Sequence, residues 1–160
     1  MAELCLPSHN PAMSSARLRE KLQRFARLDG ADRWLLIRAS AWLGVARLYL
    51  AFTSFQQLSE RLSNNVPDIR VDPDPDFLRR VGFAVRVAAA NVPWRSDCFP
   101  QAIAARMLLK RRGHASRIHL GVEKSGEGSI AGHAWLTCGD VVVVGGEDLD
   151  RYTEMHRFNE

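Results

Sequence analysis

A cysteine and a histidine are the residues of this 160-residue chain best placed to carry out chemistry. Cys98 lies two residues before Pro100, and proline is favoured in the first turn of an α-helix. A sulfur at a helix N-terminus lies beside a partial positive charge and free backbone N–H groups, which favour an anionic sulfur. His133 belongs to an alternating segment that predicts a β-strand. The pair could act as nucleophile and base; alternatively, Cys98 is a small buried side chain and His133 a hydrogen-bonded residue of a sheet.

The segments around these two residues predict one helix followed by three strands. The stretch PQAIAARMLLKRR (100–112) has a strong helical pattern, which Gly113 ends after a basic last turn. The expected strands cover residues 115–123, 130–137 and 141–144, with a hairpin turn at 138–140. The predicted fold class is therefore α+β, with the cysteine on a helix and the histidine in an antiparallel sheet.

Further helices are expected before this unit. Apolar residues at helical spacing predict helices from Ser14 or Ser15 to about Leu28, from Asp32 to about Phe52 and from Asp76 to about Ala90. Prolines between residues 64 and 75 disfavour helix in the residues before them, which indicates an extended connection. We therefore divide the chain into a flexible lead (1–13), an N-terminal helical part (14–75) and a core (76–160).

Composition and charge exclude several classes of protein. The chain is 46% hydrophobic and 25% charged, as is typical of a soluble globular domain. Its net charge is +4, but the positive charges are scattered along the predicted helices, so no nucleic-acid partner is expected. The longest apolar region (34–52) contains Arg38 and Arg47, each costing about 2.5 to 3.5 kcal/mol near a bilayer centre. We expect no membrane span, although this region is a candidate docking surface.

The remaining cysteines and histidines indicate neither a disulfide framework nor a metal site. Cys5, Cys98 and Cys138 follow no repeating interval, and the first residues lack the basic start and apolar block of a secretory signal. A reducing cytoplasm is therefore the expected compartment. His114 and His119 have no acidic or cysteine partner at metal-ligand spacing, so no metal or other cofactor is expected.

A set of motifs around Cys98 and His133 resembles the lasso-peptide leader peptidases, which are transglutaminase-like cysteine proteases of lasso-peptide biosynthesis. The motifs are VPWRSDCFPQA (92–102), LLKRRG (108–113), LGV (120–122), GHAW (132–135), VVGG (143–146) and DRY (150–152). HAW alone has little specificity, whereas the set covers about residues 76–158. The N-terminal helices fit more loosely, as a stand-alone form of this family would. The resemblance implies a papain/transglutaminase-like core.

The resemblance also implies an activity and its partners. Cys98 would attack the leader–core amide of a ribosomally made precursor peptide, and His133 would activate the thiol and then protonate the leaving core amine. A small leader-recognition protein would deliver the precursor. An ATP-dependent lasso cyclase would then join the freed N-terminus to an acidic side chain.

The motifs offer more than one candidate for a third catalytic residue. The family expects an acid on the strand after the histidine, but a turn centred on residues 139–140 places His133 opposite Gly145 and Gly146. We choose Asp148 as the orienting acid. The alternatives are Glu147, Asp140, or a dyad whose imidazole is oriented by a backbone or amide group.

Three further residues are candidates for substrate binding: Trp94, Arg95 and Trp135. Each also has a structural interpretation, because Trp135 could pack in the core and the other two could pack the turn before Cys98. The predicted function is that of a leader peptidase. The alternatives are a transglutaminase-like amide or acyl transferase and a non-catalytic peptide-binding scaffold.

Overall fold

The computed structural model describes residues 15–52, 74–124, 130–147 and 149–158. Its helices are α1 (Ser15–Arg27), α2 (Gly30–Phe52), α4 (Pro75–Ala89) and α5 (Cys98–Lys110), with a short 3-10 helix, η1 (Leu149–Arg151). Its strands are β1 (Arg117–Lys124), β2 (Ile130–Cys138), β3 (Val141–Val144) and β4 (Thr153–Phe158). The predicted α+β class is confirmed.

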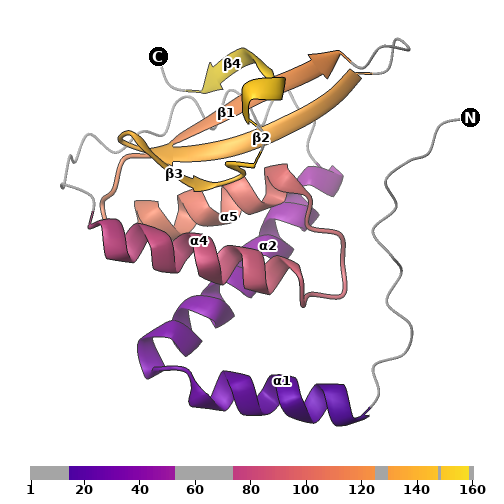
Figure 1. Cartoon of the computed structure of the whole chain (residues 1–160), viewed down its shortest axis with the longest axis vertical. Coiled ribbons are helices and arrows are strands. Elements are labelled where there is room, and N and C mark those ends of the chain that lie inside the picture. The colour runs from indigo at the N-terminus through magenta and orange to yellow at the C-terminus, as the bar shows by residue number, and fades with distance from the viewer. Residues whose placement is uncertain (1–14, 53–73, 125–129, 148, 159–160) are drawn as a thin grey trace, which may run out of the picture.

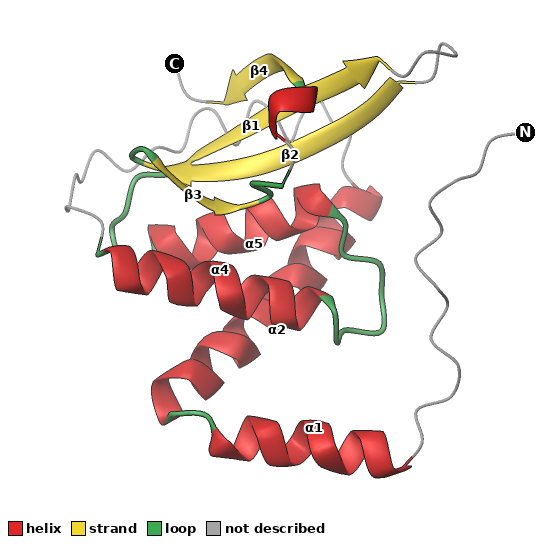
Figure 2. Ribbon diagram, in the orientation of Figure 1, coloured by secondary structure: helices red, strands yellow, loops and turns green. Residues whose placement is uncertain are grey.

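The described strands form one antiparallel sheet in the order β3-β2-β1-β4 (Figure 2). The first three strands lie within two residues of their predicted positions, and the hairpin turn falls at Gly139 and Asp140 as expected. β4 is missing from the prediction, because its sequence TEMHRF has no alternation of apolar and polar residues. Its position depends on backbone pairing with β1, which a single-strand pattern does not reveal.

The sheet lies on α4 and α5, and α2 crosses the other side of these two helices (Figure 1). α5 packs under β2, and α4 packs under β3. The largest fully buried side chains come from all of these layers: Leu43, Leu78, Val81, Leu109, Ile118 and Leu136. α2, from the N-terminal helical part, therefore shares one hydrophobic core with the elements that follow it.

α5 begins at Cys98, two residues earlier than the sequence pattern predicts. Asp97 has an extended backbone at the N-cap, and Pro100 occupies the third helical position. Proline is tolerated there because an N–H group in the first turn has no acceptor within the helix. The correction moves Cys98 from the approach to the helix into its first turn.

α4 approaches β3 so closely that one position on the helix has no room for a side chain. A Cβ atom added to Gly82 would overlap the carbonyl oxygen of Val143. On the same helix, the Arg86 guanidinium donates to that carbonyl at 3.5 Å. Gly82 therefore sets the distance between α4 and β3, and with it the position of the segment that follows β3.

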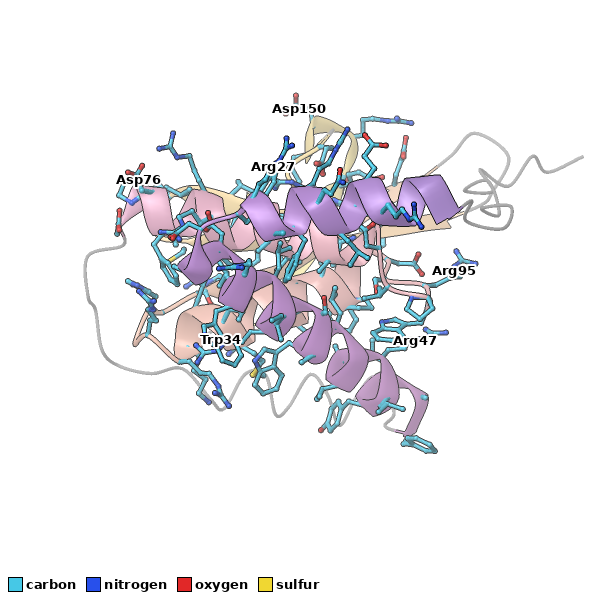
Figure 3. The ribbon with its side chains drawn as sticks, turned by 90° about the horizontal axis from the view of Figure 1, so that it is seen from below. Arg27, Trp34, Arg47, Asp76, Arg95 and Asp150 are labelled. Atoms are coloured by element: carbon cyan, nitrogen blue, oxygen red, sulfur yellow. The ribbon has the colours of Figure 1, made fainter. Side chains whose placement is uncertain are left out.

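α2 carries apolar side chains on two opposite sides. Its core side consists of Leu36, Ala39, Leu43 and Ala46. Its outer face consists of the exposed side chains of Trp34, Ile37, Val45, Leu48 and Phe52. Figure 3 shows Trp34 projecting from this helix, and the Arg38 guanidinium lies 5.5 Å from the centroid of its ring. Among the described residues, α2 is the one helix long and apolar enough to cross a membrane, but its core side packs on α4 and α5.

Replacing Gly82 with alanine should destabilise the fold, because the new methyl group would force α4 and β3 apart. We expect G82A to lower the free energy of unfolding by about 1 to 3 kcal/mol, as overpacking does. Urea denaturation followed by circular dichroism measures this. G30A is the matched control, because a Cβ at Gly30 would meet nothing within 4 Å. Equal stability of the two variants would contradict this account of the contact.

Candidate active site

Cys98 lies at the N-terminus of a helix whose first turn is held by backbone contacts. Gln101 N–H donates to the Asp97 carbonyl at 3.3 Å, closing the first turn. The Asp97 carboxylate makes no capping hydrogen bond and instead lies 3.6 Å from the Arg95 guanidinium. That carboxylate therefore does not cap the N–H groups of the first turn, which carry the partial positive charge of the helix N-terminus.

The turn before Cys98 is fixed by Gln101, which lies three residues after the cysteine. Its side-chain Nε2 donates to the carbonyl oxygen of Ser96 at 2.8 Å. This hydrogen bond joins the first helical turn to the chain that enters it. The hydrogen bond therefore joins residues on either side of Cys98 in the chain and fixes the backbone that carries this half-buried side chain.

His133 is held by a backbone carbonyl of the segment after β3. Its Nε2 lies 2.9 Å from the carbonyl oxygen of Gly145. A carbonyl oxygen can only accept a hydrogen bond, so Nε2 carries the hydrogen and Nδ1 of the neutral ring is left as the acceptor. The arrangement therefore prepares Nδ1 of His133 to accept a proton.

Gly145 is the residue that this contact requires. Its φ angle is +73°, a conformation in which a side chain is strained. A Cβ atom there would also lie 2.5 Å from the Ala134 carbonyl oxygen and 3.0 Å from the Trp135 Cα. The chain can turn back against β2 and present its carbonyl to His133 only because position 145 has no side chain.

Cys98 and His133 line the same pocket, which has a volume of about 480 Å³. α4, the turn before α5, α5 itself, β2 and the segment after β3 all contribute to it. The lining residues are Arg86, Ala89, Ala90, Ser96, Cys98, Gln101, His133, Gly145 and Glu147. Its volume is in the range of small-molecule and peptide side-chain sites. The fold thus places a thiol and an imidazole at one concave surface.

The three candidate acids lie in different places relative to the pocket and to the described residues. Asp148, our choice from the sequence, lies outside the described residues. Glu147 is exposed and lines the pocket, whereas Asp140 is exposed in the turn between β2 and β3. Among the described residues, the group that holds the His133 ring nitrogen is the Gly145 carbonyl, which corresponds to the backbone-oriented alternative.

None of the three candidate substrate contacts is among the described residues that line the pocket. Trp94 packs against α2, where its ring would be 3.3 Å from a Cβ added to Gly44. Arg95 is exposed and pairs with Asp97. Trp135 is buried in the sheet. Their role in substrate binding stays a prediction.

Several polar groups of the pocket were not predicted from the sequence as parts of the site. Gln101 could have been found, because residues three apart in a helix share a face and Gln101 lies three after Cys98. Arg86 gives no such signal, since only the packing of α4 against α5 and β3 brings it to the pocket. The Gly145 carbonyl belongs to the main chain and has no signature of its own.

Cys138 differs from Cys98 in its surroundings. It is buried, and its thiol donates to the Ala115 carbonyl at 3.2 Å. Burial raises the pKa of the Cys138 thiol above its ordinary value. Cys5 lies outside the described residues. Within the described part of the chain, no group of three or more His, Cys, Asp or Glu residues could hold a metal ion.

The fold and the pocket together define an α+β protein with a thiol–imidazole site of the kind used in acyl transfer. A model of the transglutaminase-like superfamily matches residues 40–157, about three quarters of the chain, and the chain belongs to this superfamily. Members of the superfamily are generally cysteine peptidases or acyl transferases. No curated protein and no solved structure gave a significant match.

The two described thiols should differ in reactivity. In native protein at neutral pH, we expect iodoacetamide to modify Cys98 well before Cys138, because burial and the raised pKa keep the Cys138 thiol protonated and covered. Peptide mapping by mass spectrometry after timed quenching measures both rates. In denaturant the two rates should become similar. Equal rates in the native protein would show that Cys138 is not protected as described.

Proposed function

We propose that the protein is a cysteine protease that removes the leader peptide from a ribosomally made lasso-peptide precursor. The observation that carries the proposal is the shared pocket of Cys98 and His133 in a transglutaminase-like fold. The motifs around these residues, which resemble the leader peptidases, supply the substrate class. Activity as a cysteine peptidase agrees with what the superfamily generally does.

The chemistry follows from the tautomer of His133. Nδ1 accepts the proton of the Cys98 thiol, and the sulfur attacks the carbonyl carbon of the leader–core amide. As the C–N bond breaks, the imidazolium returns that proton to the leaving core amine, and the leader remains as a thioester on Cys98. Water, deprotonated by the same Nδ1, then attacks the thioester. Leader carboxylic acid and free thiol are released.

The negative charge of the tetrahedral intermediate needs donors near the sulfur. The backbone N–H of Cys98 belongs to the first turn of α5, and the Asp97 carboxylate makes no hydrogen bond to that turn. We assign this N–H as one oxyanion donor, because preorganised backbone donors contribute a large share of catalysis in acyl transfer. The helix macrodipole acts in the same direction.

A transglutaminase-like transferase would form the same acyl-enzyme but pass it to an amine. The two activities are separated by product mass, since cleavage adds water to the substrate and cross-linking of a glutamine to an amine releases ammonia. A non-catalytic peptide-binding scaffold would yield neither product. Glu147 is exposed and Cys98 is partly exposed, so water can reach the pocket, as hydrolysis requires.

Replacing Cys98 with alanine should abolish cleavage of a candidate precursor, with a loss of at least about a thousandfold in rate. The assay combines the protein, precursor and leader-recognition protein and identifies products by mass spectrometry. C138A is the matched control and should retain cleavage. Circular dichroism shows whether both variants are folded. Cleavage by folded C98A would exclude the proposed mechanism.

The leader-recognition protein, the precursor and a lasso cyclase in the cytoplasm are the proposed partners. We place the recognition protein on the outer face of α2, because this face exposes five large apolar side chains. Contiguous apolar surface of this kind on a globular domain is typical of protein interfaces. The interaction would bring the leader to the same molecule that holds the pocket.

Replacing Leu48 with glutamate should weaken this docking without unfolding the chain, because Leu48 is 62% exposed. We expect L48E to raise the Kd for the leader-recognition protein at least about tenfold, because the interface would lose one apolar contact and would bury a charge. Isothermal titration calorimetry measures it. V141E is the control, because Val141 is an exposed apolar residue of β3. Equal effects of both substitutions, or none, would rule out α2 as the docking face.

A further inference from the structure

The imidazole of His133 is in contact with more than the Gly145 carbonyl. The ring of Tyr152 stacks on it, with 4.7 Å between the ring centroids and 25° between the planes. Trp135, on the same strand, lies 6.2 Å from it at 19°. One edge of the imidazole is therefore fixed by a hydrogen bond, and one face is covered by an aromatic ring.

Tyr152 is held in place by the backbone on both sides of it. Its N–H donates to the Leu149 carbonyl at 3.1 Å, which ends η1. The next residue, Thr153, pairs with Val122 and begins β4. Tyr152 thus lies at a junction between two hydrogen-bonded elements, and its position is set by the main chain.

The space for these rings exists because the strand beneath them has a glycine. Gly121 of β1 lies opposite His133 in the β1–β2 register. A Cβ atom added there would lie 2.9 Å from Trp135 Cζ3 and 3.0 Å from the Tyr152 Cβ. Tyr152 and Trp135 therefore occupy the volume that a side chain at position 121 would fill.

The neighbouring ring is itself braced. Trp135 stacks on His119 with 5.2 Å between centroids and 4° between planes. His119 Nε2 lies 2.9 Å from Thr137 Oγ1. His119 is accordingly half-buried. Four rings on this face of the sheet form a row: His119, Trp135, His133 and Tyr152.

We propose that Tyr152 is a positioning residue for His133 and that it acts through the face of its ring. A single hydrogen bond at Nε2 leaves the imidazole free to swing about that bond, and Tyr152 blocks the motion. Nδ1, the ring nitrogen that Gly145 leaves as the acceptor, is then held in one position at the pocket. The π face also attracts the imidazolium that forms while His133 carries the proton from sulfur to the leaving amine. The catalytic consequence of this role rests on the proposed function, whereas the stacking of Tyr152 on His133 does not depend on it.

Tyr152 variants test the proposal without any precursor. The first readout is the rate at which iodoacetamide modifies Cys98 at neutral pH, which depends on proton transfer to a correctly placed imidazole. We expect Y152L to lower this rate about fivefold or more and Y152F to stay within about twofold of the unchanged protein. Rescue by phenylalanine separates the ring face from the hydroxyl.

A double-mutant cycle shows whether Tyr152 acts through His133. H133A should slow modification of Cys98, and the double variant H133A/Y152L should be no slower than H133A alone. Additive effects would overturn the proposal, because they would mean that Tyr152 influences Cys98 by another route. Full reactivity of Y152L, or equal loss in Y152F and Y152L, would also overturn it.

The proton NMR signals of the His133 ring give a second, independent readout. Stacked under an aromatic ring, the carbon-bound protons should be displaced upfield, and H133A identifies them by their disappearance. The displacement should persist in Y152F and vanish in Y152L. If Y152L does not fold, Y152M keeps the side-chain bulk and replaces it in each measurement. An unshifted His133 signal in the unchanged protein would refute the stacking.

Failure of this inference is distinguishable from failure of the proposed function. The C98A cleavage assay tests whether the protein is a peptidase. The positioning role of Tyr152 is tested separately, by the rate of Cys98 modification and by the NMR signals of the His133 ring. When a precursor is cleaved, Y152L should lower kcat about ten- to a hundredfold and leave KM unchanged, since misplacing a catalytic group affects the chemical step.

Discussion

The hydrogen bond between His133 and the Gly145 carbonyl is the contact on which the rest of the site depends. It selects the ring nitrogen that carries hydrogen, and so the nitrogen that can accept a proton. It exists only where the chain can turn at a φ of +73° against β2. The position of that turn depends on how closely β3 approaches α4. This close approach is possible because Gly82 has no side chain. A local contact at the imidazole is therefore set by the packing of a helix on a strand.

The cysteine is positioned by a different part of the same core. α5 presents an almost entirely buried surface to its neighbours, rich in alanine, so the helix lies close to the sheet. The packing of α5 on the sheet therefore also fixes where its N-terminus lies relative to β2. Since α2 packs on α4 and α5, the N-terminal helical part contributes to the rigidity of the site, although none of its described residues lines the pocket.

Local patterns were sufficient for the parts of the fold that have short-range causes. The helix after Cys98, the hairpin at Gly139 and the alternating strands could all be predicted, because each depends on residues within a few positions. β4 could not, since it pairs with residues of β1 that lie about 31 to 40 positions away in the chain. Nor could the stacking of Tyr152 on His133, which brings together two separate segments of the chain. The register argument placed Gly145 and Gly146 opposite His133, but the β2–β3 pairing has a bulge and ends at Leu136 and Val144. The contact with Gly145 comes instead from the His133 ring, and it uses a main-chain carbonyl where the argument looked for a side chain. Asp148 stays a prediction.

An imidazole oriented by a main-chain carbonyl has a property that a carboxylate orienter lacks. A carbonyl has no proton to gain in the range where carboxylic acids titrate, so acidification cannot remove this acceptor from His133. Nor can substitution of a side chain delete it, because every residue type carries the same oxygen. The vulnerability of the site lies instead in backbone geometry, at one glycine whose replacement would bend the chain away.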